Sequence, residues 1–290
     1  MTSKYPSHVE AITPFGWYGG KTMDLQFVLP IIDIPHQIYV EPFGGSAAVL
    51  LHKEQSEVEV YNDVDERLIT FFDVLRNRKE ELIDQLRYTP YSRRAFERAV
   101  EFQDKGSEAS DVEKARQFFI SVQQSYSGHP DATKGRWGYT RKESRRGKSC
   151  VVNNWQQKIK SMNEVAERMG EVQIECKPAI DIIQRYDHEE ALHYLDPPYI
   201  HESREQNSLD VYDTEMSEKD HRELLEIARG ADGYVAISGY PNDVYEEELE
   251  EYGWLRQDKT ASANTADDGQ KERVECVWTN YDPEPVSNNE

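Results

Sequence analysis

The sequence is poor in cysteine and has no long apolar run. Its three cysteines, Cys150, Cys176 and Cys276, are odd in number and far apart, which argues against a disulfide framework and against a zinc site. The eight histidines have no metal-ligand spacing either. No segment approaches the roughly 20 apolar residues of a membrane helix, and the N-terminus lacks the pattern of a secretory signal. We therefore expect no metal, no membrane association and a cytoplasmic location.

Basic residues are also scarce. The chain has 34 lysines and arginines against 55 aspartates and glutamates, a formal net charge of -21. Taken alone, this charge argues against a nucleic-acid partner, which usually requires a basic face. The acids are spread along the chain rather than gathered in one tail. This favours a solvated, halophilic-type acidic surface over a DNA-mimicking or acidic interaction module. We expect the protein to lose stability when potassium chloride is removed.

Short β-branched runs alternate with amphipathic stretches along the chain. Helices are expected at 65–76, 93–103, 112–126 and 217–230, the last with a cap formed by Ser217 and Asp220. Strands are expected at 37–43, 58–63, 172–176, 192–199, 234–240 and 273–280. This alternation predicts an α/β fold with a mostly parallel sheet and helices on both faces.

The interval 79–168 differs from the rest of the chain in its residue pattern and local charge. It begins with helical patterns and ends in the stretch 134–148, where seven bases and one acid give a local charge of +6. Aromatic residues are interleaved with these bases. Such a concentration in an acidic chain favours a loop that contacts phosphates over a plain solvated face. The candidate DNA-binding residues are Lys134, Arg136, Trp137, Tyr139, Arg141, Lys142, Arg145, Arg146 and Lys148.

A glycine-rich turn follows the first expected strand, in YVEPFGGSAAVL (39–50). Gly44 and Gly45 would let a ligand approach the backbone, and we expect a helix after them whose N-terminal amides are free. Glu41 at the entrance suits a cationic group better than a phosphate, and the pattern is not that of a phosphate-binding loop. The next strand ends in Asp63, which could bind a ribose hydroxyl or cap the following helix. Both alternatives stay open.

The segment LDPPY (195–199) combines a carboxylate, two prolines and a ring at the end of an apolar strand. Proline ends a central strand and keeps the preceding residue extended. An amino group conjugated to an aromatic base is a poor nucleophile. Hydrogen bonds from its hydrogens to Asp196 and to the Pro197 carbonyl would stabilise the positive charge that develops on attack. Tyr199 would stack on the base, which must first leave the duplex. A plain Pro-Pro turn explains the prolines but not their neighbours.

In this order, the motifs closely resemble those of Dam-like (D12 class) DNA adenine N6-methyltransferases, particularly phage and prophage members, over nearly the whole chain. The similarity lies in PFGWYGGK (14–21), YVEPFGGSAAVLL (39–51), VYND (60–63), LDPPY (195–199) and segments at 212–225, 236–249 and 273–281. The resemblance implies a Rossmann-like S-adenosylmethionine-dependent methyltransferase sheet with helices on both faces. Residues 1–78 and 169–282 would form the catalytic domain, 79–168 a smaller, mainly helical target-recognition insert, and 283–290 a flexible tail.

The resemblance also implies roles for individual residues. The residues expected to bind S-adenosyl-L-methionine are Trp17, Tyr18, Gly19, Gly20, Lys21, Glu41, Pro42, Phe43, Gly44, Gly45, Asp63 and Asp196. The catalytic residues expected to hold a flipped adenine are Asp196, Pro197, Pro198 and Tyr199. No metal is implied. The chain departs from the family at Ala47, which replaces a glycine and is expected to matter little. It also departs at Pro178 and Ala179, where many members have an Asp-aromatic pair that approaches the cofactor adenine.

The resulting hypothesis is methyl transfer to adenine N6 in double-stranded DNA by a monomer. N4-cytosine methylation is an alternative because the same corner can hold either amino group, although the motif order favours adenine. A catalytically inactive DNA-binding relative is a second alternative, against which the intact site residues Lys21, Glu41, Asp63, Asp196 and Tyr199 argue. A role beside a cognate restriction nuclease and a role as an orphan enzyme both remain open.

Overall fold

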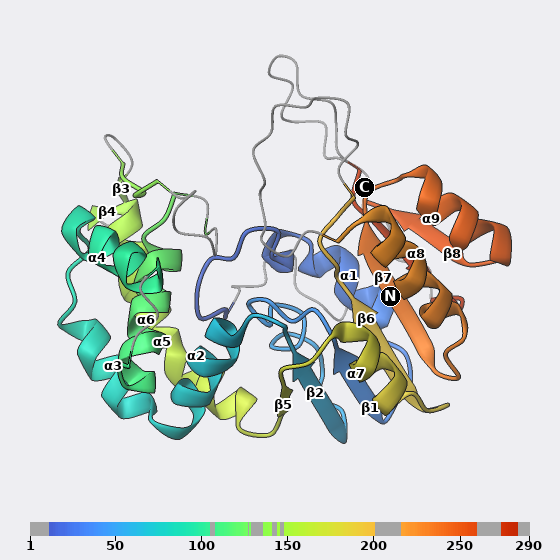
Figure 1. Ribbon diagram of the computed structural model, residues 1–290, viewed down its shortest axis with the longest axis horizontal. Helices are drawn as coiled ribbons and strands as arrows, with labels where there is room; N and C mark the ends of the chain where they lie inside the picture. Colours follow the sequence, from blue (N-terminus) through green and yellow to red (C-terminus); the bar gives the residue numbers. More distant parts are fainter. Residues whose placement is uncertain are drawn as a thin grey trace, which may run out of the picture.

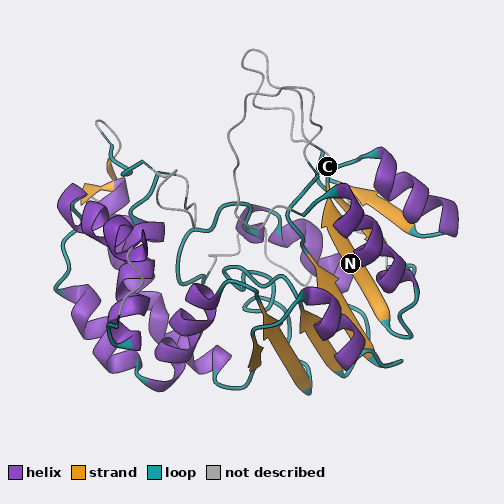
Figure 2. Cartoon of the chain, in the orientation of Figure 1, coloured by secondary structure: helices purple, strands orange, loops and turns teal. Residues whose placement is uncertain are grey.

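The computed structural model describes residues 12–104, 108–126, 128, 136–140, 144–145, 148–200, 216–259 and 274–283. Figure 1 shows two parts side by side, a sheet with its covering helices and a group of helices next to it. Figure 2 shows the same division by secondary structure, because all of the large strands lie in one part.

The main sheet has seven strands in the order β5-β2-β1-β6-β7-β9-β8. Their bounds are β1 (Ile38–Glu41), β2 (Val58–Asn62), β5 (Gln173–Glu175), β6 (Ala191–Leu195), β7 (Tyr234–Gly239), β8 (Leu255–Asp258) and β9 (Cys276–Thr279). The first five strands of this order run parallel, while β9 is antiparallel to β7 and β8. The predicted mostly parallel sheet is confirmed. Strand β8 had no sequence signature because its LRQD segment is a polar edge strand.

Helices cover both faces of the sheet, as predicted. Side chains alternate along each strand, so Tyr39 and Tyr194 belong to one core cluster whereas Leu195 and Trp278 belong to another. The first cluster includes residues of α1 (Leu25–Ile32), α2 (Glu66–Asn77) and α6 (Cys150–Met169), together with the other helices of the second part described below. The second cluster includes residues of α7 (Ala179–Tyr186), α8 (Glu218–Arg229) and α9 (Asp243–Glu248). The predicted capping box of Ser217 and Asp220 is present at the start of α8.

The second part is a helical group that follows β2. It contains α2, α3 (Lys79–Arg87), α4 (Arg93–Asp104), α5 (Asp111–Gln123), a short hairpin of β3 (Ser144–Arg145) and β4 (Lys148–Ser149), and α6. Phe71 on α2 stacks on Phe119 of α5, with ring centroids 6.1 Å apart. Phe15, from the N-terminal segment, meets Phe71 edge-on at 5.1 Å. The helical group therefore shares its hydrophobic core with one face of the sheet.

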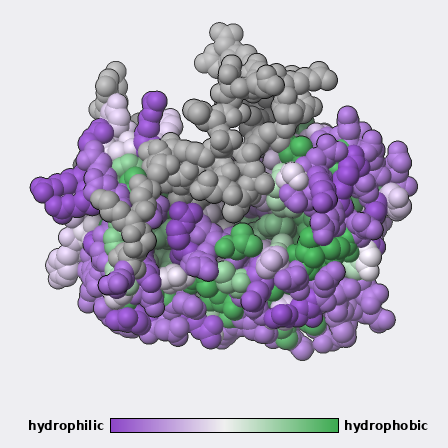
Figure 3. Space-filling model, viewed as in Figure 1, coloured by the Kyte–Doolittle hydropathy of each residue, from purple (hydrophilic) through white to green (hydrophobic). Residues whose placement is uncertain are grey.

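Hydrophilic residues cover most of the face shown in Figure 3. Within the part of the chain that the structure describes, every helix is too short or too polar to cross a bilayer.

Candidate active site

The candidate site lies at the carboxyl ends of β1 and β6. These strands are neighbours, and the chain continues from them in opposite directions, to β2 and β5 on one side and to β7, β9 and β8 on the other. Open α/β sheets bind ligands outside the strand ends at such a reversal. Glu41 ends β1 and Asp196 directly follows β6. Glu41 and Asp196 therefore lie at the same edge of the sheet.

Lys21 joins the N-terminal motif to the LDPPY motif. It begins the short helix η1 (Lys21–Met23), and its Nζ lies 2.7 Å from Oδ1 of Asp196. Burial works against the charge on Lys21, but the carboxylates of Asp196 and Glu275 outweigh it and raise the lysine pKa. Burial raises the pKa of Asp196, against the opposing effect of Lys21. The carboxylate of Asp196 is thus partly neutralised by a residue distant in sequence.

Tyr199 and Glu275 complete this cluster. The Tyr199 hydroxyl donates a hydrogen bond to Oε1 of Glu275, and the same oxygen lies 3.3 Å from Lys21 Nζ. The Lys21 ammonium also lies 4.7 Å from the centroid of the Tyr199 ring, and Tyr240 meets that ring edge-on at 4.5 Å. No role was predicted for Glu275. Its one signal was an acid within the expected strand RVECVWTN.

The glycine-rich turn packs against two aromatic rings. A Cβ on Gly44 would lie 2.1 Å from the Tyr61 ring, so no larger side chain fits there without a shift. Gly45 has a φ of +50°, and a Cβ on it would lie 2.8 Å from Nε1 of Trp17. The turn therefore requires glycine for both space and backbone conformation. Trp17 over Gly45 brings the first two cofactor motifs into contact.

The prediction of a helix after this turn is wrong. Residues 45–52 form successive turns instead, because Gly45 and Ala47 both adopt the left-handed conformation and interrupt a helix. Ala47 has a φ of 57°, a conformation that costs about 1–2 kcal/mol for a residue with a Cβ. Glycine would adopt this conformation without that cost, while the expectation that alanine matters little in the cofactor motif stays a prediction.

Glu41 is buried beneath the turn at the end of β1. Its Oε2 accepts hydrogen bonds from the Tyr39 hydroxyl at 3.1 Å and from the Leu50 amide at 3.0 Å. Burial raises the pKa of Glu41 to about 8, although these hydrogen bonds favour its charged form. Lys53 Nζ lies 4.3 Å from the centroid of the Tyr39 ring.

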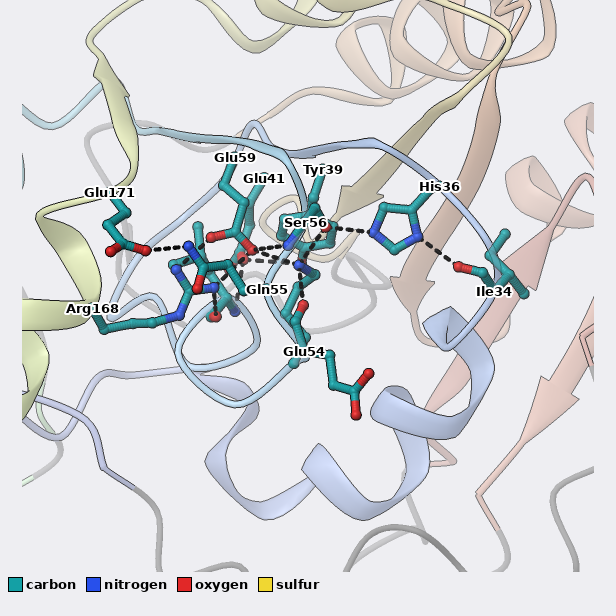
Figure 4. Close-up of polar contacts among 12 residues, drawn as sticks. Ile34, His36, Tyr39, Glu41, Glu54, Gln55, Ser56, Glu59, Arg168 and Glu171 are labelled. Carbon is teal, nitrogen blue, oxygen red and sulfur yellow. Dashed lines mark hydrogen bonds and ion pairs between the residues drawn. The ribbon is translucent and has the colours of Figure 1, made fainter.

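A network of buried charged side chains lies next to Glu41 and Tyr39, as Figure 4 shows. Glu59 on β2 pairs with Lys53 Nζ at 2.6 Å and with the guanidinium of Arg168, whose Nη2 lies 2.7 Å from Oε1. Lys53 also donates to Ser56 at 2.8 Å, and the Ser56 hydroxyl contacts Nε2 of His36 at the same distance. The network thereby connects the segment below Glu41 to α6.

Asp63 fixes the glycine turn and does not cap α2. Its Oδ2 accepts a hydrogen bond from the Gly45 amide at 3.0 Å, and its Oδ1 accepts one from the Asp65 amide at 2.9 Å. The cap is Asp65, whose side chain accepts from the Arg67 amide. The capping alternative for Asp63 is therefore excluded. Burial raises the pKa of Asp63 to about 6.

The N-terminal motif also contacts the helical group. The Tyr18 amide donates to the Gly128 carbonyl at 3.1 Å, and the Gly16 amide donates to Oε1 of Gln123 at 2.9 Å. Gly19 has a φ of +72°, and the Gly20 amide closes a turn onto Trp17. The partners Gln123 and Gly128 follow from tertiary packing, and sequence analysis missed them.

Asn62, also missed from the sequence, links β1, β2 and the segment before α7. Its amide nitrogen donates to the carbonyls of Pro42 and Lys177, and its oxygen accepts from the Lys177 amide. Pro178 then precedes α7, and the buried Ala179 begins it.

The remaining motif residues lie close by. Phe43 packs against the α7–α8 side of the sheet, Pro197 is buried, and the Pro198 carbonyl contacts the buried ring of His221.

Few of the predicted DNA-binding residues can be placed. The Trp137 ring stacks on Tyr139 with centroids 6.0 Å apart, and the guanidinium of Arg93 lies 4.9 Å from the Trp137 centroid. Arg136 is exposed, and its carbonyl accepts from the Tyr126 amide. Arg145 and Lys148 pair in the β3–β4 hairpin, but their side chains lie outside the described residues. The residues wholly outside are Lys134, Arg141, Lys142 and Arg146.

Comparison with known proteins agrees with this geometry. The model of the D12 class N6 adenine-specific DNA methyltransferase family matches residues 17–263. The chain belongs to this family. The methyltransferase is also 25% identical over 210 residues to the Type II methyltransferase M.MjaIII of Methanocaldococcus jannaschii, covering 65% of this chain and 69% of the relative. The resemblance seen in the sequence motifs is confirmed. The matched range includes LDPPY and ends before Glu275.

The residues at the edge of the sheet suit the cofactor that the family implies. Asp196 and Glu275 lie beside the Lys21 ammonium, Glu41 ends β1, Asp63 follows β2, and burial raises the pKa of each of these four carboxyls. Such a site favours a cationic ligand, and S-adenosylmethionine carries a sulfonium and an ammonium group. Within the described residues, no three His, Cys, Asp or Glu side chains are grouped to bind a metal.

Proposed function

We propose that this methyltransferase transfers a methyl group from S-adenosyl-L-methionine to N6 of adenine in double-stranded DNA. The observation that carries the proposal is the contact between Asp196 and Lys21, at the same sheet edge as the glycine turn. It joins the expected catalytic and cofactor motifs. Family membership supports the same reaction.

The cofactor site would extend from Lys21 across the glycine turn to Asp63. S-adenosylmethionine supplies a methyl group on a positively charged sulfur, which makes that methyl electrophilic. Gly44 and Gly45 let the rings of Tyr61 and Trp17 pack closely on the turn, and the cofactor would lie against the turn that these rings hold in place. Asp63 holds Gly45 and is well located to accept a ribose hydroxyl. Glu41 supports the floor through its bond to the Leu50 amide.

The target adenine would be held by the LDPPY corner after leaving the duplex. Asp196 and the Pro197 carbonyl would accept the two N6 hydrogens, which makes the nitrogen lone pair available for attack on the methyl group. The negative charge of Asp196 would stabilise the positive charge that develops on N6. Tyr199, anchored through its hydroxyl, supplies the ring for stacking. The protein thus contributes mainly position and electrostatics.

The DNA duplex would lie against the helical insert of residues 79–168 and its basic stretch 134–148. Arg136 and Tyr139 are exposed there, and the bases would contact phosphates. We expect a cytoplasmic monomer, with a cognate restriction nuclease as a candidate partner.

The test is methyl transfer from labelled S-adenosylmethionine to unmethylated DNA, from low to molar potassium chloride, with the product nucleosides identified by mass spectrometry. N6-methyladenine supports the proposal, whereas N4-methylcytosine contradicts it in favour of the alternative. No product despite cofactor binding would indicate an inactive relative.

A matched pair of variants tests the assigned role of Asp196. Asp196→Asn should lower the rate by about 100-fold or more, because it removes the charge that stabilises the transition state. Cofactor binding, measured by calorimetry, should change much less. Asp232→Asn, at an exposed aspartate, is the control and should leave the rate unchanged. Equal rates for the two variants would contradict the role of Asp196.

A further inference from the structure

Glu275 is an acidic residue of this site for which the sequence motifs implied no individual role. It directly precedes β9, and its side chain is 11% exposed. A single oxygen, Oε1, accepts the hydrogen bond of the Tyr199 hydroxyl and lies 3.3 Å from Lys21 Nζ. The side chain therefore touches two groups that surround Asp196 without contacting the backbone of either.

The backbone around Glu275 is held independently of its side chain. The Lys259 amide donates to the Glu275 carbonyl at 2.8 Å, which continues the β8–β9 pairing. Lys259 Nζ in turn pairs with Asp24 at 2.6 Å, directly after η1. This second ion pair fastens the β8–β9 end to η1. The Glu275 side chain is thus not needed to bring these elements together, and its contacts serve the site.

Charge sharing explains what Glu275 adds. Lys21 lies 2.7 Å from Asp196, so alone it would neutralise much of the carboxylate charge on which amino-group activation depends. Glu275 is a second carboxylate next to the same ammonium. The group formed by Lys21, Asp196 and Glu275 therefore carries a net negative charge. At the same time, the anchored hydroxyl fixes the plane of the Tyr199 ring. Both effects favour a positively charged reacting nitrogen.

We propose that Glu275 is a positioning residue for methyl transfer, which anchors the Tyr199 hydroxyl and shares the Lys21 ammonium so that the charge around Asp196 stays net negative. This inference rests on the proposed function, since it concerns the same reaction. Glu275 acts through Lys21 and Tyr199, and it does not itself touch the adenine.

The test is Glu275→Gln, which keeps the size and a hydrogen-bond acceptor but removes the charge. The substrate is an unmethylated DNA fragment that the wild-type enzyme methylates. We expect the single-turnover rate of Glu275→Gln on this fragment to be about 10- to 100-fold lower than that of the wild type, the range for losing a charged hydrogen bond. The affinity for DNA and the melting temperature should stay close to wild type. Glu226→Gln, at an exposed glutamate of α8, is the matched control and should be unchanged.

The pH dependence distinguishes a positioning role from a structural one. The wild-type rate should fall at low pH as Asp196 becomes protonated. Removing a neighbouring negative charge favours ionised Asp196, so Glu275→Gln should move this acidic limb to lower pH. Tyr199→Phe keeps every charge but removes the hydroxyl, whose hydrogen bond lowers the pKa of Asp196, so it should slow the reaction less and move the limb to higher pH.

Three outcomes separate the hypotheses. A slower Glu275→Gln enzyme with a displaced acidic limb and an unchanged melting temperature supports the inference. A wild-type rate and pH profile would overturn it, as would a rate loss accompanied by a large fall in melting temperature, which indicates a structural role. If the wild type itself makes no N6-methyladenine, the proposed function has failed and the inference with it.

Discussion

Glu59 is the carboxylate at the centre of the buried network beside β1, and replacing it with glutamine tests that network. Its side chain is 1% exposed, and its partners Lys53 and Arg168 are 4% and 18% exposed. Glutamine fits the same space but carries no charge, so both cations would lose their counterion. The substitution therefore isolates charge from packing.

The expected loss of stability follows from the partners that remain. Removing one member of a buried ion pair costs about 3–5 kcal/mol. Lys53 would keep Ser56 and the Glu54 carbonyl, and Arg168 would keep the Leu50 carbonyl, so we expect the lower end, about 3 kcal/mol. For 290 residues, an unfolding entropy of about 0.6 kcal/mol/K converts this loss to a fall of about 5 °C in melting temperature.

The assay is thermal unfolding by circular dichroism between pH 4 and pH 8. Burial alone would raise the pKa of Glu59, but Arg168 and Lys53 outweigh it and lower the pKa below 4.5. Its contribution is therefore present above about pH 4.5 and lost as pH falls through the lower folded value, so the variant and wild type should converge in acid. Glu57→Gln, at an exposed position of the same segment, is the control. Equal melting temperatures for Glu59→Gln and Glu57→Gln at pH 7 would refute this account of the network.

Three further predictions follow from the site and the surface. Gly44→Ala should weaken binding of S-adenosylmethionine at least about 10-fold in calorimetry, because its Cβ would lie 2.1 Å from the buried Tyr61 ring; unchanged affinity would show that the turn adapts. Glu41 has a folded pKa of about 8 against an ordinary 4.5, so wild-type stability should fall between these pH values while Glu41→Gln does not titrate. The melting-temperature difference between the two should thus grow in favour of the variant from pH 5 to pH 8, and a constant difference would contradict the assignment. Finally, the melting temperature should rise from low to molar potassium chloride, since the net charge of -21 repels itself; no change would count against a salt-adapted surface.

The acidic run at 246–251 illustrates the limit of counting charges in a sequence. Composition favours a solvated surface there, but much of the run is paired in the structure. Arg222 binds Glu247 and Glu248, and Arg256 lies 3.4 Å from Glu250. The formal charge of this segment is therefore partly compensated by arginines from α8 and β8, and only packing brings them together.

The sequence by itself predicted the mostly parallel sheet with helices on both faces, six of the seven strands of the main sheet and the helices α2, α4, α5 and α8. These features depend on side-chain periodicity and on proline and glycine backbone preferences, which act over a few residues. The carboxyl-end location of Glu41 and Asp196 was predictable too, because parallel strands present their ends at one edge.

Only the tertiary structure decided how the site is assembled. The sharing of Lys21 between Asp196 and Glu275, the position of Trp17 over Gly45, and the turns in place of a helix at 45–52 all depend on segments that packing brings together. No local pattern specifies which carboxylate will meet which ammonium, because the attraction between charges acts through space. Residue types therefore determined the chemistry available to this protein, and the fold determined which groups share it.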